Sequence, residues 1–503
     1  MNGEQFQRRS MIKTTAAGSL AWATGSVPLV HADARQPSQA IAKENEKPGT
    51  TGWQLDKTKI DPETRYRCPW IEGYCSDTSI RAGETLRIFV STNPAAAFSL
   101  DIYRLGFYQG KGGRLVRRIG PLESQTRREP AVGKHRLRNC DWPVSAELSI
   151  PKDWLSGIYV GKLTSSIDGW QSYVVFIVRD DRPADLLFQC SDHTWQAYNR
   201  WPSQFSLYDD GQNQWYWGGK SQVSFNRPYG KYCQILDQPL STGSGEFFLW
   251  EFPFVHWLEA NHYDVSYISN QDTHHDAEGL ERGRGFLSVG HDEYWTIEMF
   301  QNVQRAITAG VNVGFFSGNA VCGKVLYDSA TRSFRRIGVF GPPEGTRDFS
   351  SMDELAHGRP YANELIGAHS TGPVTGGADW ICTNPTHWIY QDTGMQQGDS
   401  VPGMIGWEWH GDPAPIEGLQ VVATGPTQSA PGQLNGGQYT ATVYPGPRNN
   451  FVFNAATCWW ADGLSEPPGY VRPSVYTSPQ GPNAKIQKIT ANILDRMIAG
   501  SGA

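Results

Sequence analysis

Several kinds of sequence signal are absent from this chain, and each absence removes a class of protein. Its eight cysteines form no C-x-x-C pair, so neither a zinc ribbon nor a thioredoxin-type redox site is indicated. No G-x-S-x-G occurs, which argues against a serine nucleophile on a strand-to-helix elbow. Basic residues cluster only near the N-terminus and the formal net charge is -6, so nothing favours nucleic acid as a partner.

Long hydrophobic runs are also missing. The apolar run that ends near Val30 contains Thr, Ser, Gly and Pro and is too mild for a membrane anchor. It follows the basic segment Arg8 to Lys13 and precedes a small-residue end at Ala32, and this order matches a twin-arginine export signal over residues 1–32. We therefore expect a periplasmic or secreted protein without a membrane span in its mature form. The alternative is a cytoplasmic protein with an accidental arginine pair.

The length of the chain predicts more than one domain. Its 503 residues exceed what one hydrophobic core usually organises. Residues 33–65 are rich in Gln, Lys, Glu, Pro and Thr and predict a flexible lead-in. From 66 to 180, short alternating runs such as Thr85 to Val90 are separated by Gly, Pro and Asp, which is typical of strands. Strands of this length and number predict an immunoglobulin-like β-sandwich.

After a charged hinge that ends at Pro183, the pattern of apolar and polar residues changes. Strand candidates now alternate with helix candidates, which predicts an α/β domain over 183–503 with a parallel sheet of flavodoxin-like or glutamine-amidotransferase-like type. The expected strands are 185–189, 264–268, 285–289, 311–316 and 450–454. A helix is expected after Thr296, a good N-cap, and another closes the chain at 485–499. A region at about 340–449 is rich in Gly, Pro and Thr and predicts an irregular, partly β insertion.

Polar and aromatic side chains are dense in three segments that each follow a predicted strand. These segments are 191–210, His291 to Trp295 and Ser317 to Ala320. If the strand order is 2-1-3-4-5, strands 1, 3 and 4 are neighbours and the loops after them share one cleft. Any one segment alone would be an ordinary polar loop, but three at predicted strand ends favour a binding or catalytic site.

The motifs in these segments, TWQAYN, SLYD, GHDEYW and FFSGNA, resemble the large-subunit family of N,N-dimethylformamidase. In that family a single iron is held by two tyrosines and a glutamate and activates water to hydrolyse an amide. The resemblance therefore implies that Tyr198, Tyr208 and Glu293 hold one iron ion, as Fe³⁺, in each chain. The two tyrosine segments are closer together here than in the amidase, which predicts a shortened loop at the rim of the pocket and leaves the substrate open.

The chemistry of these residue types agrees with the resemblance. Two phenolates and a carboxylate form a hard, anionic oxygen set that suits a ferric ion and leaves positions open for water and a carbonyl oxygen. His291 is expected to hydrogen-bond a ligand or carry a proton, and Asn319 to donate a hydrogen bond to the developing oxyanion. Without the motifs, Tyr198 and Tyr208 would be interpreted as packing residues and Glu293 as a partner of a helix N-terminus.

Two functions remain open from the sequence. The first is a metal-dependent hydrolase of a small amide C–N bond, with a small-molecule substrate and either a small partner subunit, as in the resembling family, or a homo-oligomeric assembly. The second is an exported carbohydrate-binding or cell-surface recognition protein without catalysis, because 19 Trp and 21 Tyr could form platforms for sugar rings. Glycan binding that survives mutation of Tyr198 and Glu293 would favour the second.

Overall fold

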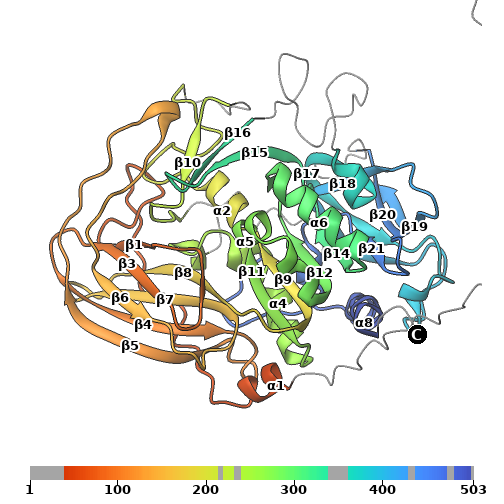
Figure 1. Cartoon of the computed structure of the whole chain (residues 1–503), viewed down its shortest axis with the longest axis horizontal. Helices are drawn as coiled ribbons and strands as arrows, with labels where there is room; N and C mark the ends of the chain where they lie inside the picture. Colours follow the sequence, from red (N-terminus) through yellow and green to blue (C-terminus); the bar gives the residue numbers. More distant parts are fainter. Residues whose placement is uncertain are drawn as a thin grey trace, which may run out of the picture. The chain divides into compact units, whose positions relative to one another are not determined.

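The computed structural model describes residues 39–212, 219–231, 239–337, 361–428, 437–472 and 481–499. The predicted export signal at residues 1–32 lies outside the described residues. In the described part, strands outnumber helices and fall into several separate sheets (Figure 1). The general expectation of an α/β protein with additional all-β structure is therefore confirmed.

The helices are mostly short. They are α1 (Ala40–Asn45), α2 (Asp192–Tyr198), α3 (Phe247–Trp250), α4 (Phe252–Ala260), α5 (Asn270–His275), α6 (Ile297–Ala309), α7 (Ala362–Ile366) and α8 (Ala484–Ala499). Helix α6 begins where predicted, because the Thr296 side chain accepts from the Met299 N–H, and it ends at Gly310 in a left-handed conformation. None of the described helices combines the length and apolarity needed to cross a bilayer.

Two sheets enclose a hydrophobic core in the first part of the chain. One contains β1 (Glu72–Cys75), β3 (Thr85–Ser91) and β6 (Ala146–Ser149) in that order, and the other β2 (Ser79–Arg81), β8 (Gln171–Arg179), β7 (Gly157–Ser165), β4 (Ala97–Leu105) and β5 (Gly113–Glu123). Alternate side chains of both sheets, such as Leu86 and Ile88 of β3 and Leu100 and Ile102 of β4, belong to one buried cluster. This layering agrees with the all-β character expected for residues 66–180.

A seven-stranded sheet organises the second part. Its order is β11 (Val265–Ser269), β9 (Ala184–Cys190), β12 (Gly283–Gly290), β14 (Asn312–Ser317), β21 (Phe451–Asn454), β20 (Gln438–Pro445) and β19 (Gln420–Pro426). The first five strands pair in parallel, and β20 and β19 add antiparallel. Counted along the chain, the parallel strands have the order 2-1-3-4-5. The carboxyl ends of β9, β12 and β14 therefore lie at the same edge, as the predicted site requires.

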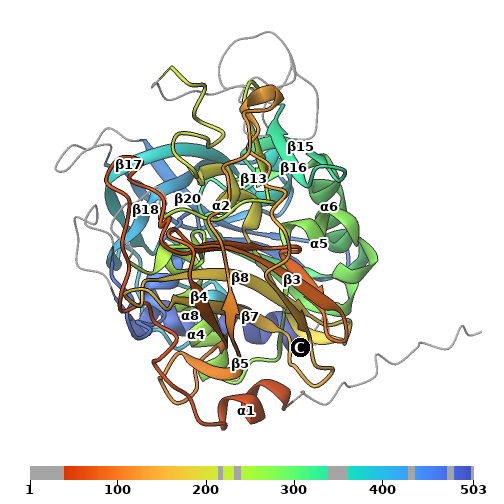
Figure 2. The same cartoon turned by 90° about the vertical axis from the view of Figure 1, so that its left-hand side faces the viewer.

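Helices cover both faces of this sheet (Figures 1 and 2). Because successive residues of a strand point to opposite faces, Phe188 and Leu287 share a buried cluster with α4 and α8, whereas Leu187 and Phe286 share one with α6. The strands are thus buried on both sides, which is why they appear in the sequence as continuous apolar runs.

Residues 39–65 differ from the flexible lead-in that their composition predicted. Ile41 of α1 and Trp53 are fully buried, and Asn45 Nδ2 donates to Glu259 of α4 at 2.9 Å. The segment has few apolar residues, but these complete a core that other parts of the chain supply. Average composition could not show this.

One core joins the first part of the chain to the second. Val160 of β7 and Tyr173 of β8 belong to the same buried cluster as Tyr267 of β11. Inside this region Arg104 and Glu259, both fully buried, form a two-pronged ion pair with N–O distances of 2.8 and 2.9 Å. The sandwich is therefore packed firmly against the seven-stranded sheet.

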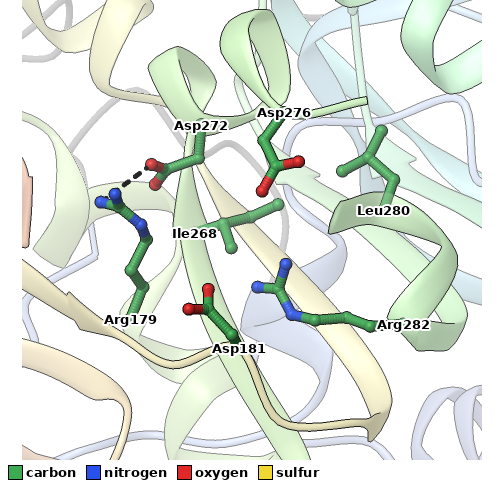
Figure 3. A pocket seen from close by; sticks show the side chains of 7 residues that line it. All are labelled: Arg179, Asp181, Ile268, Asp272, Asp276, Leu280 and Arg282. Carbon is green, nitrogen blue, oxygen red and sulfur yellow. Dashed lines mark ion pairs between the residues drawn. The ribbon is translucent and has the colours of Figure 1, made fainter. Parts of the chain in front are cut away.

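The charged hinge predicted around residues 179–183 is held by ion pairs. Arg179 Nη1 lies 3.1 Å from Asp272 Oδ1 of α5, and Arg182 Nη1 lies 2.8 Å from Asp264 Oδ2. Figure 3 shows Arg179 and Asp272 among the side chains that line a small pocket. Its cavity of about 10 Å³ has room for about one water molecule. The hinge is thus a fixed junction.

The region at about 340–449, expected to be an irregular, partly β insertion, contains four strands in its described part. In its described part β17 (Ala368–Ile381) and β18 (Ser400–Pro413) pair antiparallel, while β19 and β20 extend the seven-stranded sheet. Register shifts interrupt the ladder between β17 and β18, so these strands lack a clean alternation in the sequence. These four strands agree with the partly β character expected for this region.

A four-stranded sheet lies beside the loops that follow β9 and β12. It contains β10 (Gln222–Ser224), β16 (Ser333–Arg336), β15 (Gly323–Asp328) and β13 (Tyr294–Trp295). Phe225, Val325 and Phe334 from this region pack with Tyr198 and Tyr208 in one buried cluster. The sheet thus forms an apolar wall behind the two tyrosines.

Candidate functional site

Three loops at the carboxyl edge of the seven-stranded sheet form a common polar centre. Helix α2 follows β9, residues 291–293 follow β12, and residues 318–322 follow β14. Two glycines allow the close approach: Gly290 has φ of 71°, and a Cβ on Gly318 would lie 2.0 Å from the carbonyl oxygen of Glu408. The polar side chains therefore meet at the edge that the strand order predicted.

Tyr198, Tyr208 and Glu293 bring their side-chain oxygens together. The hydroxyls of Tyr198 and Tyr208 are 2.7 Å apart. The Tyr198 hydroxyl donates to Glu293 Oε2 at 2.6 Å, and the Tyr208 hydroxyl donates to Glu293 Oε1 at 3.2 Å. All three residues are buried, and Tyr294 adds a further hydroxyl that contacts the hydroxyl of Tyr208. The residues predicted as metal ligands thus share one buried location.

His291 and Asn319 meet at a residue that the sequence prediction missed, Glu408 of β18. His291 Nε2 contacts Glu408 Oε2 and lies 3.5 Å from Glu293 Oε2. Asn319 Nδ2 donates to Glu408 Oε2 at 3.1 Å. Glu408 lies inside the region interpreted as an irregular insertion, so no strand end pointed to it. The available signal was the position of Glu408 between Trp407 and Trp409. A carboxylate among large apolar residues is rarely buried without a partner, so it marks a candidate polar site.

Burial and nearby acidic groups shift the pKa values of this centre. Burial raises the pKa of Glu293 to about 7 and Glu408 adds to this rise, whereas His291 lowers it. Burial alone would lower the pKa of His291, but Glu408 and Glu293 outweigh it and the pKa rises to about 9. Burial, followed by the charge of Glu293, raises the pKa of both Tyr198 and Tyr208 well above the usual value. The phenols therefore keep their protons unless a cation compensates.

The oxygen donors fit a hard cation. Two phenol oxygens and a carboxylate suit Fe³⁺, and their oxygens are as close together as those of ligands that share one ion. His291 and Arg336 both lower the pKa of Glu293, against the effect of burial, and the Arg336 guanidinium lies 5.7 Å from the Tyr294 ring. A cation would permit the phenols to ionise, which is the chemical condition for ligation.

Cys458 lies beside the centre. His291, Glu408 and Cys458 each place one possible ligand atom within 4.8 Å of the others. The Cys458 thiol donates to the Gly318 carbonyl oxygen at 3.4 Å, and burial raises its pKa well above the usual value. Its sulfur is a softer donor than the tyrosine and glutamate oxygens, so it is less suited to a hard ferric ion.

The fold and the site together define an α/β protein with a buried centre of tyrosine, histidine and carboxylate groups at the carboxyl edge of a parallel sheet. The chain belongs to the family described as N,N-dimethylformamidase beta subunit-like, C-terminal, which matches residues 99–473. This membership confirms the resemblance inferred from the motifs. No curated protein matches the chain.

Among solved structures, the chain has a distant likeness to a family 123 glycoside hydrolase from Clostridium perfringens, studied for the details of glycolipid glycan hydrolysis. The two are 12% identical over 53% of this chain and 52% of that chain, with a TM-score of 0.11. The chain thus spans about half the length of that structure. A likeness at this TM-score supports no inference about fold or function.

Proposed function

We propose that this protein is a metal-dependent hydrolase of the C–N bond in a small amide, with one iron ion held by Tyr198, Tyr208 and Glu293. One observation carries the proposal: the hydroxyl oxygens of Tyr198 and Tyr208 and Oε2 of Glu293 lie within 3.3 Å of one another in a buried location. Membership of a dimethylformamidase-related family supports the amide as the substrate class. When bound, a ferric ion would polarise an amide carbonyl and lower the pKa of water.

The remaining residues have roles that follow from their contacts. His291 holds a proton at Nε2 between Glu408 and Glu293, so it is placed to donate that proton to a departing amine. Asn319 presents an amide N–H₂ beside the same carboxylate, and one of its two hydrogens remains to stabilise negative charge on a carbonyl oxygen. Glu408 orients both donors. The apolar wall behind Tyr198 and Tyr208 excludes water from one side of the centre.

The experiment pairs metal analysis with turnover. Purified wild-type chain is analysed for iron and assayed for amine release from N-substituted formamides, beside Glu293→Gln and a control, Glu364→Gln, in the separate helix α7. We expect about one iron per wild-type and control chain, and loss of both iron and amine release in Glu293→Gln. A well-folded wild-type chain that holds no metal and releases no amine would refute the proposal.

The carbohydrate-binding alternative has less support. Among the largest fully buried side chains are the indoles of eight tryptophans, and buried indoles cannot serve as platforms for sugar rings. These residues are Trp53, Trp195, Trp201, Trp250, Trp295, Trp380, Trp459 and Trp460. The high tryptophan content is therefore explained in large part by the core.

We also propose the cellular location, the domain folds and the assembly of this protein. The order of the arginine pair, the apolar run and Ala32 supports export by the twin-arginine route, with residues 1–32 removed. The sheet orders support an immunoglobulin-like sandwich at 66–180 and a flavodoxin-like domain at 183–503. A family described as beta subunit-like supports a small partner subunit, with a homo-oligomer as the other assembly.

A further inference from the structure

Asp292 follows His291 in the loop after β12, but a different set of residues holds its side chain. Its fully buried carboxylate accepts hydrogen bonds from Gln189 Nε2 at 2.6 Å, from Ser288 Oγ at 2.8 Å and from Asn270 Nδ2 at 3.0 Å. These donors come from β9, from β12 and from the start of α5. Three segments of the chain thus converge on one carboxylate.

Second partners fix the orientation of both amides. Asn270 Oδ1 accepts from the His193 N–H at 2.9 Å, so its Nδ2 is the atom that faces Asp292. Gln189 Oε1 accepts from the Thr273 hydroxyl, so its Nε2 likewise faces the carboxylate. All these neighbours donate, and no ion pair to Asp292 occurs among the residues that the structure describes. Asp292 is therefore the acceptor in each of these hydrogen bonds.

The backbone around Asp292 is tied to the loop after β14. The Asp292 carbonyl accepts from the Val321 N–H at 3.0 Å, and the Glu293 carbonyl accepts from the Gly323 N–H at 2.9 Å. Val321 has φ of 54°, a conformation that a β-branched residue adopts only when its surroundings enforce it. Thr194 Oγ1 also accepts from the Glu293 N–H at 2.9 Å. The position of Glu293 therefore depends on hydrogen bonds to the strained loop after β14 and on the buried carboxylate of Asp292.

We infer that Asp292 is the positioning residue of this centre, whose anchored carboxylate fixes the backbone from which His291 and Glu293 extend. Asp292 does not touch the proposed ligand oxygens and is not a catalytic residue. The inference rests on the proposed function for the role of the centre. The hydrogen-bonded frame itself, however, is measurable without substrate or metal.

The test exchanges the donor and acceptor side chains of the hydrogen bond between Asn270 and Asp292. In Asp292→Asn, one remaining oxygen has to serve three donors. In Asn270→Asp, two buried carboxylates face each other across a contact that is now a hydrogen bond of 3.0 Å, which is unfavourable for both. The double variant Asn270→Asp/Asp292→Asn reverses the polarity of the bond, restores it, and still offers an acceptor to the His193 N–H.

The readout is amide hydrogen exchange of Glu293, Val321 and Gly323 in the full, metal-free chain. We expect exchange to be about tenfold faster or more in each single variant, because a buried hydrogen bond is lost and its partner is left unsatisfied. Exchange should return to within about threefold of the wild type in the double variant. Asp264→Asn, which removes a buried carboxylate paired with Arg182, is the control and leaves these amides unchanged.

Two results would overturn the inference: wild-type exchange in Asp292→Asn, or a double variant that exchanges as fast as Asn270→Asp. If Asn270→Asp fails to fold, Ser288→Ala is used instead, because it removes one donor to Asp292. Exchange is measured at the same amides, and unchanged exchange counts against the inference. Iron affinity is measured in parallel and is expected to fall at least about tenfold in Asp292→Asn and to recover in the double variant. A wild type without iron refutes the proposed function alone, since the exchange data still decide the role of Asp292.

Discussion

The ion pair of Arg104 and Glu259 predicts that the sandwich and the seven-stranded sheet unfold together. Both side chains are fully buried. Glu259 accepts from both guanidinium nitrogens, from the Tyr267 hydroxyl at 3.0 Å and from Asn45 Nδ2 at 2.9 Å. Glu259→Gln leaves the Arg104 charge buried without its counter-ion and turns an amide nitrogen toward neighbouring donors. Breaking a buried pair in this way costs about 3–5 kcal/mol.

This cost is observable as a shift of one cooperative transition. An unfolding entropy of about 2.1 cal/mol/K per residue, summed over residues 39–499, is roughly 1 kcal/mol/K, so Glu259→Gln should lower Tm by about 3–5 °C. Circular dichroism and tryptophan fluorescence should report the same transition. The control, Asp181→Asn, breaks the exposed pair of Arg81 and Asp181 and should lower Tm by about 1 °C or less. Equal shifts in the two variants, or a shift in only part of the transition, would refute a shared core.

Three further predictions follow from the site and its supports. Asn319→Ala should lower kcat for amide hydrolysis by roughly 10²–10³ with a smaller change in KM, because a donor to the developing oxyanion is lost; an unchanged kcat would remove Asn319 from the machinery. His410 Nε2 accepts from the Ala320 N–H while its Nδ1 faces Asn454 Oδ1, and burial lowers its pKa to about 4 although Asn454 raises it. The folded pKa of His410 lies below the unfolded value of 6.5, so this residue lowers the free energy of unfolding as pH falls from 6.5 to 4. In His410→Gln, the loss of urea-unfolding free energy over that interval should be smaller by roughly 3 kcal/mol. An unchanged pH dependence would contradict a neutral buried ring. In Gly318→Ala the new Cβ would lie 2.0 Å from the Glu408 carbonyl oxygen and 2.7 Å from the Cys458 nitrogen, so urea unfolding should show a loss of about 1–3 kcal/mol or more, whereas Gly133→Ala, with no contact under 3.4 Å, should show little change.

Much of the second part of the fold was accessible from the sequence. Strands that are buried on both faces appear as apolar runs, and the helix after Thr296 carries its own cap and stop. These signals are local, so they survive in a single sequence. The order 2-1-3-4-5 was assumed from the sequence because it is common in such sheets; the structure has this order, which brings the segments of Tyr198, Glu293 and Asn319 to one edge.

The parts that the sequence did not predict depend on long-range contacts. The segment around Trp53 looks too polar to fold by itself, and it is ordered only because a core built by β8 and α4 receives its few apolar side chains. Strand β18 carries glycines and register shifts, so its alternation is hidden. Glu408 lies on this strand and could not be assigned to the centre before the strand was placed.

The role of Asp292 was hidden for a related reason. In the sequence it is one acidic residue between His291 and Glu293, and no local pattern distinguishes a side chain that reaches the centre from one that anchors the loop. Only the positions of Gln189 and Asn270, on other elements, show which role it has.

The most direct test of the central claim is the visible absorption spectrum of the chain loaded with ferric ion. Phenolate ligands give such an ion an intense charge-transfer band, so the wild type should show one. Tyr198→Phe and Tyr208→Phe should each weaken or shift the band, while Tyr444→Phe, at a buried tyrosine that donates to the Leu365 carbonyl oxygen, should leave it unchanged. A ferric-loaded wild type without the band, or one whose band is the same in all three variants, would contradict the assignment of the two tyrosines as ligands.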